Sequence, residues 1–118
     1  MQEYLTPHQV ADLLQVGTHT VWRWEREGTM PFVQAGERAR RIGKARLLEW
    51  LAERRSQPLE TPLQDVPAFS TTSTVAKRLQ VTPQTVRRWI NEVGLPAYRL
   101  PRQLLIADKD LQKWLKTQ

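Results

Sequence analysis

Two matching segments decide the fold: Thr18-His19-Thr20-Val21-Trp22-Arg23-Trp24-Glu25-Arg26-Glu27 and, 65 positions later, Pro83-Gln84-Thr85-Val86-Arg87-Arg88-Trp89-Ile90-Asn91-Glu92. On an α-helix, at about 100° per residue, Val21 and Trp24 fall on one side and the polar residues on the other. The polar side of each copy carries Arg with His, Gln or Asn, and Arg, Gln and Asn can hydrogen bond to base edges in a DNA major groove. A single helix of this kind is usually a solvated surface helix. Its repetition favours a pair of DNA recognition helices instead.

The similarity extends beyond these segments and indicates two small domains on one chain. Between residues 10–31 and 75–96, 11 of 22 positions are identical, and most of them are of the buried type. Tryptophans recur at matching places, Trp24 with Trp89 and Trp50 with Trp114, and we expect them to supply much of each small core. The predicted organisation is a first domain over 1–55, a linker over 56–67 that contains three prolines, and a second domain over 68–118.

Each copy begins with signals for two short helices in succession. A capping Thr followed by a Pro at the first helical position occurs twice. Thr6-Pro7 starts the first helix of the first copy, and Thr82-Pro83 starts the second helix of the second copy. Gly17 suits a turn with positive φ, and Thr18 could cap the helix that follows it. The buried stripes of the preceding helices are Val10, Ala11 and Leu14 in the first copy and Val75, Ala76 and Leu79 in the second.

Pro31 and Pro96 stop the recognition helices, and a hairpin and a closing helix are predicted after each. The first hairpin covers 32–42 and turns around Gly36, and the second covers 97–106 and is one residue shorter. The closing helices run over 45–53 and from a capping Asp108. The predicted fold is therefore mainly α, with three short helices and a small β-hairpin wing in each of two tandem winged helix-turn-helix domains.

Composition and charge favour a polyanionic partner. The net charge of +6 divides into nine Lys/Arg against seven Asp/Glu in 1–55, none against two in 56–67, and nine against three in 68–118. The second copy is thus the more basic, as phosphate contact would require. The sequence has no cysteine, no signal peptide and no apolar run of membrane-spanning length, so we expect a soluble, cytoplasmic protein associated with the nucleoid and no membrane partner.

The order of these elements resembles the MerR-like, excisionase-type winged helix-turn-helix family, over residues 4–53 and 69–116. The resemblance implies a DNA-binding function, with recognition helices at 18–27 and 83–92 and wings at 36–41 and 99–103. MerR regulators proper carry a long dimerising helix and an effector domain after one such unit. This chain has a second unit in that place, so no small-molecule effector is indicated.

The helix faces and the resemblance together give the residues that we expect at the DNA. The Thr hydroxyls could also serve only as helix caps, and the hairpin arginines could serve only to keep an edge strand soluble. Trp22 could touch a sugar or a thymine methyl, or pack against protein. The expected DNA-binding residues are Thr18, His19, Thr20, Trp22, Arg23, Arg26, Arg38, Arg40, Arg41, Thr82, Gln84, Thr85, Arg87, Arg88, Asn91, Arg99 and Arg102.

No pattern for catalysis, a cofactor or a metal site is present: the two His lack partner ligands, and the carboxylates are scattered. An enzyme is therefore not expected. The favoured function is sequence-specific binding of double-stranded DNA, as a transcriptional regulator or an excisionase-like architectural factor in recombination. Additional partners would be a second copy of the chain or a recombination or transcription protein. The alternative is a protein-interaction adaptor in which only the second, more basic unit binds DNA.

Overall fold

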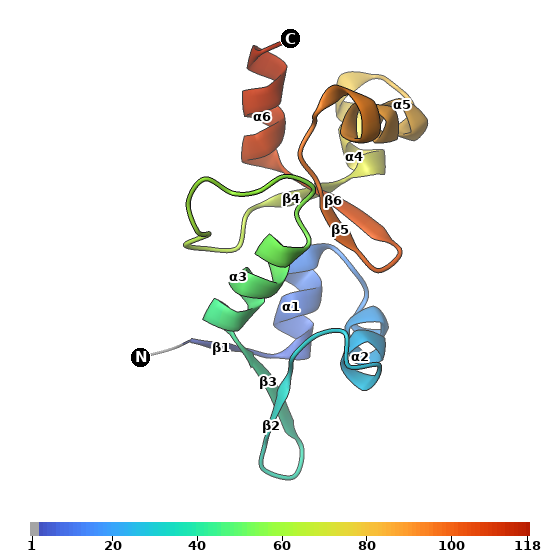
Figure 1. Cartoon of the computed structure of the whole chain (residues 1–118). Helices are drawn as coiled ribbons and strands as arrows, with labels where there is room; N and C mark the ends of the chain where they lie inside the picture. Colours follow the sequence, from blue (N-terminus) through green and yellow to red (C-terminus); the bar gives the residue numbers. More distant parts are fainter. Residues whose placement is uncertain (1–2) are drawn as a thin grey trace. The chain divides into compact units, whose positions relative to one another are not determined.

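The computed structural model describes residues 3–118, which form two compact units. Unit 1 comprises Met1–Glu53 and Leu63–Val66, and unit 2 comprises Arg54–Pro62 and Pro67–Gln118. Figure 1 labels the elements along the chain. Unit 1 contains β1 (Tyr4–Leu5), α1 (Pro7–Leu14), α2 (Thr18–Arg26), β2 (Val33–Ala35), β3 (Ala39–Gly43) and α3 (Lys44–Glu53). Unit 2 contains β4 (Phe69–Thr71), α4 (Thr72–Leu79), α5 (Pro83–Arg88), the π-helical turn η1 (Trp89–Val93), β5 (Tyr98–Leu100), β6 (Gln103–Ala107) and α6 (Asp108–Lys116).

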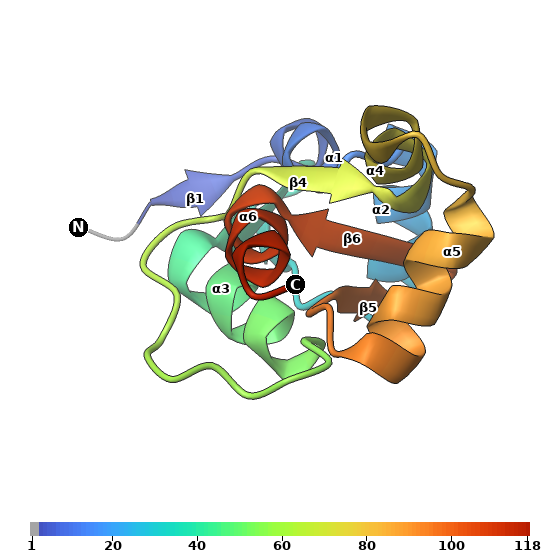
Figure 2. The ribbon, with the colours of Figure 1, turned by 90° about the horizontal axis from the view of Figure 1, so that it is seen from above.

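The two units repeat one arrangement of helices and strands, as the sequence predicts. Each has three helical segments and a β-hairpin, but each hairpin is joined by a third strand that the sequence did not reveal. The resulting antiparallel sheets have the order β1-β3-β2 and β4-β6-β5. Figure 2 shows β6 between β4 and β5. The hairpin loops hold three residues between β2 and β3 and two between β5 and β6, which confirms that the second hairpin is shorter.

The predicted helix starts are confirmed at the two Thr-Pro pairs. Thr6 Oγ1 accepts from the Gln9 amide at 3.1 Å, and Gln9 Oε1 accepts from the Thr6 amide at 2.9 Å, a complete capping box. Thr82 Oγ1 accepts from the Thr85 amide at 3.2 Å. These bonds satisfy amides that have no partner inside the helix.

Three local predictions were wrong. Gly17 has φ −74° and is itself the cap of α2, while Thr18 is already helical. The residue with a left-handed backbone conformation is instead Gln15, at the end of α1, with φ 60°. The positive φ therefore comes two residues before Gly17. Asp108 is the first residue of α6 rather than its cap, and its Oδ1 accepts from Ser70 Oγ at 2.7 Å instead.

The matched tryptophans pack in pairs in both units. Trp24 and Trp50 are each 1% exposed, with ring centroids 6.0 Å apart. Trp89 and Trp114 lie 5.3 Å apart but remain partly exposed at the edge of their core. Each pair joins one tryptophan of the recognition helix to one tryptophan of the closing helix. The pair therefore packs these two helices against each other in each unit.

Residues 54–66 comprise the last two residues of the predicted first domain and most of the predicted linker, and they divide between the units, 54–62 with unit 2 and 63–66 with unit 1. In unit 2, the Ser56 amide donates to the Ala97 carbonyl at 2.7 Å and the Arg99 amide donates to the Arg54 carbonyl at 2.8 Å. Residues 54–56 therefore pair with the outer edge of β5. In unit 1, Asp65 Oδ1 lies 2.9 Å from Lys44 Nζ, and this hydrogen bond lowers the pKa of the Asp65 carboxyl.

Candidate nucleic-acid interface

The polar sides of α2 and α5 lie at the surface, and their apolar sides lie in the cores. In unit 1, Val21 and Trp24 are buried, whereas His19, Trp22 and Arg26 are exposed. Arg23 and Thr20 are half-buried. In unit 2 the exposed residues are Gln84, Arg87, Arg88 and Asn91. The division into an inner and an outer face is the one that the 3.6-residue period requires.

Hydroxyl groups at the start of each helix are bonded within the protein. Thr18 Oγ1 lies 3.2 Å from His8 Nδ1, which ties α2 to α1. Thr82 Oγ1 lies 3.0 Å from Thr85 Oγ1 and caps α5. Capping thus occupies Thr82, while the Thr18 hydroxyl contacts a side chain that the sequence did not connect with it.

The three arginines of the first hairpin have different surroundings. Arg38 is exposed in the loop opened by Gly36, whose φ of +79° is one that L side chains rarely adopt. Arg40 forms an ion pair with Glu25 of α2 and donates to Gln34 Oε1 at 2.9 Å. Arg41 donates to the Arg40 carbonyl at 2.8 Å. Arg40 therefore fixes the hairpin to α2, and Arg38 is a cation exposed at the surface.

The second hairpin is joined to its recognition helix in another way. Arg99 Nη2 donates to Asn91 Oδ1 at 2.9 Å, so two of the predicted DNA-binding residues are bonded to each other. Arg102 is exposed at the tip of the hairpin and adopts φ 61°, a left-handed conformation that costs energy for a residue with a Cβ. At the positions of Glu25 and Arg40, unit 2 has Ile90 and Leu104, which both belong to its hydrophobic cluster.

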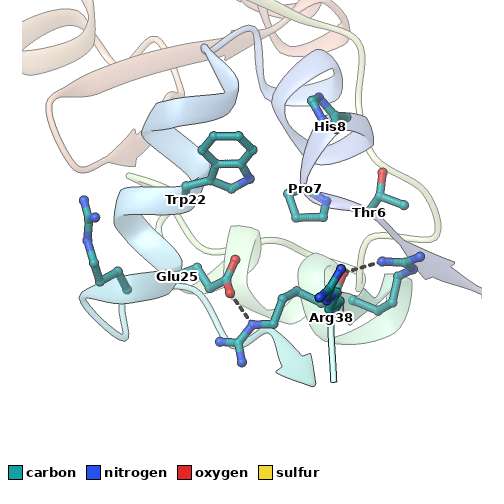
Figure 3. A pocket seen from close by; sticks show the side chains of 9 residues that line it. Thr6, Pro7, His8, Trp22, Glu25 and Arg38 are labelled. Carbon is teal, nitrogen blue, oxygen red and sulfur yellow. Dashed lines mark hydrogen bonds and ion pairs between the residues drawn. The ribbon is translucent and has the colours of Figure 1, made fainter. Parts of the chain in front are cut away.

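A notch opens between the recognition helix, the start of the preceding helix and the hairpin in each unit. In unit 1 its volume is about 730 Å³, and its walls include Trp22, His8 and Pro7 (Figure 3). In unit 2 its volume is about 620 Å³, and its walls include Arg87 and Arg99. Each notch lies beside the exposed side of the recognition helix.

Residues that precede the recognition helices also line these notches, which the sequence pattern did not indicate. The sequence predicts His8 as a polar surface residue rather than a metal ligand, and its ring lies edge-on to Trp22 with centroids 6.2 Å apart. Thr71 and Ser73 line the second notch. The repeat could have located them, because Ser73 stands where the first copy has His8.

Among residues 3–118, no group of three His, Cys, Asp or Glu side chains is placed to hold a metal ion. The helices in this part of the chain are all too short or too polar to cross a lipid bilayer.

Comparison with known proteins identifies the repeat. A family model described as a helix-turn-helix domain matches the sequence twice, over residues 4–55 and 71–118. The two matches fall on the two copies found in the sequence. No curated protein and no solved structure matches the chain.

Proposed function

The chain belongs to the helix-turn-helix domain family, which indicates DNA binding, and we propose that both units bind double-stranded DNA through α2 and α5. The observation that carries the proposal is that corresponding helices of the two units turn arginine-bearing sides to the surface. An α-helix fits a major groove, where each base pair presents a distinct pattern of donors and acceptors.

Base contacts are assigned to the outer sides of these helices. Arg23 and Arg88 occupy the same position in the two copies and are the first candidates for bidentate bonds to guanine. Gln84 can bond adenine in the same way. The other helix residues of the contact set are His19, Thr20, Arg26 and Asn91, which face the bases, and Arg87, which faces the backbone.

Backbone contacts are assigned to the hairpins and the helix starts. Arg38, Arg41, Arg99 and Arg102 supply cations for phosphate, and Thr18, Thr82 and Thr85 lie at helix N-termini, where amides favour anions. Arg40 acts through its ion pair with Glu25, which positions the hairpin against α2.

Because the base-facing residues of the two units differ, each unit should prefer its own half-site. Tandem linkage raises the effective concentration of the second unit once the first is bound. Such a protein suits a transcriptional regulator or an architectural factor in recombination, acting at the nucleoid with a recombination or transcription protein or with a second copy of itself.

The test is DNA binding by full-length variants, after selection of a bound sequence from a random DNA pool. Arg23→Ala and Arg88→Ala should each weaken binding to that sequence by about 10- to 100-fold, as expected for loss of one bidentate contact to guanine. Arg46→Ala is the matched control, because Arg46 lies on α3 and pairs with Glu49 and Glu53. Normal binding by both helix variants would refute the proposal.

One second candidate function has an observation in its favour. Unit 1 contains an exposed Trp22 and a small net charge, as a unit that docks on protein would. In that case the chain is an adaptor in which only unit 2 binds DNA. Arg88→Ala would then weaken DNA binding, and Arg23→Ala would leave it unchanged.

A further inference from the structure

The two notches occupy the same position in the repeated fold. Six lining positions correspond: Thr6 with Thr71, Pro7 with Thr72, His8 with Ser73, Trp22 with Arg87, Arg38 with Arg102, and Arg40 with Leu104. Because the units share one fold, both notches should face the same part of a DNA duplex. Their chemistry nevertheless differs, and the exchange of Trp22 for Arg87 is the largest difference.

The notch of unit 2 has the side chains of a phosphate site. Three arginines line it, Arg87, Arg99 and Arg102, and Arg99 also donates to Asn91 Oδ1. Ser73 lines it as well, beside Thr71, whose hydroxyl caps α4 by accepting from the Thr74 amide. Guanidinium groups bind phosphate with charge-assisted, often bidentate hydrogen bonds. We name this set of five residues the Arg87 notch.

The notch of unit 1 has an apolar floor in the same place. Trp22 is 52% exposed, and its indole points from α2 toward Pro7 and His8 at the start of α1 (Figure 3). The rings of Trp22 and His8 meet at 75° with their centroids 6.2 Å apart, and the Thr18 hydroxyl lies 3.2 Å from His8 Nδ1. We name this site the Trp22 notch and call Arg26, Arg38 and Arg41 its rim arginines. Thr6 and the Arg40–Glu25 ion pair line it as well.

Trp22 cannot replace Arg87 as a phosphate ligand, because an indole carries no positive charge. A flat base cannot stack between Trp22 and His8 either, since stacking needs parallel rings and these are nearly perpendicular. The carbon face of a deoxyribose fits an apolar floor of this kind. The rim arginines would then reach the phosphates on either side of that sugar.

We infer that the Trp22 notch packs against a deoxyribose of the DNA backbone, while the Arg87 notch binds a phosphate by charge. The inference rests on the proposed function, since it requires unit 1 to lie on DNA. It means that the two units hold the backbone by different forces: unit 1 partly by burial of apolar surface, and unit 2 by charge.

Salt dependence separates these forces in the full-length protein. Each phosphate contact contributes about −0.9 to the slope of log K against log salt. Arg87→Ala should therefore make the slope shallower by about 0.9. Trp22→Ala should weaken binding by about tenfold at every salt concentration, because it removes the burial of roughly half a tryptophan side chain. Trp22→Phe should recover most of the loss.

Exchanging Trp22 and Arg87 between the two units gives the pair of variants that discriminates best between the two kinds of contact. Trp22→Arg gives unit 1 the residue of unit 2, and it should steepen the slope by about 0.9. Arg87→Trp should make it shallower by the same amount. Because both side chains are exposed, neither exchange disturbs a core. Far-ultraviolet circular dichroism and thermal unfolding check that the variants fold.

A scan of the selected DNA locates the sugar. Single ribonucleotides are placed along each strand, since a 2′-hydroxyl on a packed sugar face should weaken binding of the wild-type chain at one or two adjacent positions. Trp22→Ala should be insensitive at those positions, which isolates the pairwise contact. Replacement of thymine by uracil, which removes only the methyl group, should have no effect that depends on Trp22.

Several outcomes would overturn the inference. The first is that Trp22→Ala binds DNA with unchanged affinity, and the second is that Trp22→Ala makes the salt slope shallower by as much as Arg87→Ala does. The third is that uracil substitution weakens binding only when Trp22 is present, while ribonucleotides have no effect. Failure of the proposed function has a different signature, because the wild-type chain would then bind no DNA, or Arg23→Ala would have no effect.

Discussion

Arg55→Ala tests whether the segment before the second copy belongs to unit 2. Arg55 lies outside the second domain that the sequence predicts, yet its Nη1 is 2.6 Å from Asp110 Oδ2, and its Nη2 is 3.5 Å from Oδ1. Its guanidinium also lies over the Tyr98 ring, 5.5 Å from the centroid. The two side chains of the ion pair are 10% and 22% exposed, so water screens the pair poorly.

The expected loss of stability follows from this burial. Removal of one partner of a buried ion pair costs about 3–5 kcal/mol, and the partial exposure of Asp110 places Arg55→Ala near the lower end, at about 3 kcal/mol. That corresponds to a change of roughly 100-fold in the folding equilibrium. The matched control is Arg46→Ala, whose exposed ion pairs should contribute less than about 1 kcal/mol.

Hydrogen exchange followed by mass spectrometry measures the effect in each unit of the intact chain. Amides of β5 and β6 should lose about 100-fold in protection, because exchange from a core strand reports its opening free energy. Amides of α1 and α2 should keep theirs. If Arg55→Ala behaves like Arg46→Ala, or loosens both units equally, residues 54–56 are not part of the folded unit 2.

Three further predictions concern local features. Arg40→Ala should destabilise unit 1 by about 1–2 kcal/mol in urea unfolding. The double variant E25I/R40L introduces the residues that unit 2 has at these positions and should restore nearly all of the lost stability. A double variant as unstable as Arg40→Ala would contradict this. Arg102→Gly should stabilise the chain by about 1 kcal/mol in thermal unfolding while weakening DNA binding, because glycine accepts a positive φ freely; a lower stability would refute the strain. The pKa of Asp65 is lowered chiefly by its hydrogen bond from Lys44. This contact therefore stabilises the folded state fully above pH 3.8, the ordinary pKa of the carboxyl, and the stabilisation is lost as the pH falls through the lower pKa of the folded state. Lys44→Met should raise the pKa of Asp65 in a carbon-13 NMR titration, and an unchanged pKa would disprove the pairing.

The helix faces were predictable, because the period of an α-helix fixes which side chains share a side. The partners of those side chains were not, since Arg40 and Glu25 stand 15 residues apart and Arg99 and Asn91 stand eight apart, with no sequence signal that joins them.

The amino-acid sequence alone predicted the repeat, the two recognition helices, the caps Thr6 of α1 and Thr82 of α5, and the matching places of the tryptophans in the two copies. The helices and their caps depend on periodicity and on neighbours within a few residues, so a short stretch of sequence contains their signal, and the repeat is found by comparing the two halves of the chain. How each sheet is completed depends on the three-dimensional structure. A strand as short as Tyr4–Leu5, or the pairing of residues 54–56 with β5, forms through backbone hydrogen bonds that any residue type can make. Such pairing leaves no pattern in the side chains, and it follows from where the chain runs in space.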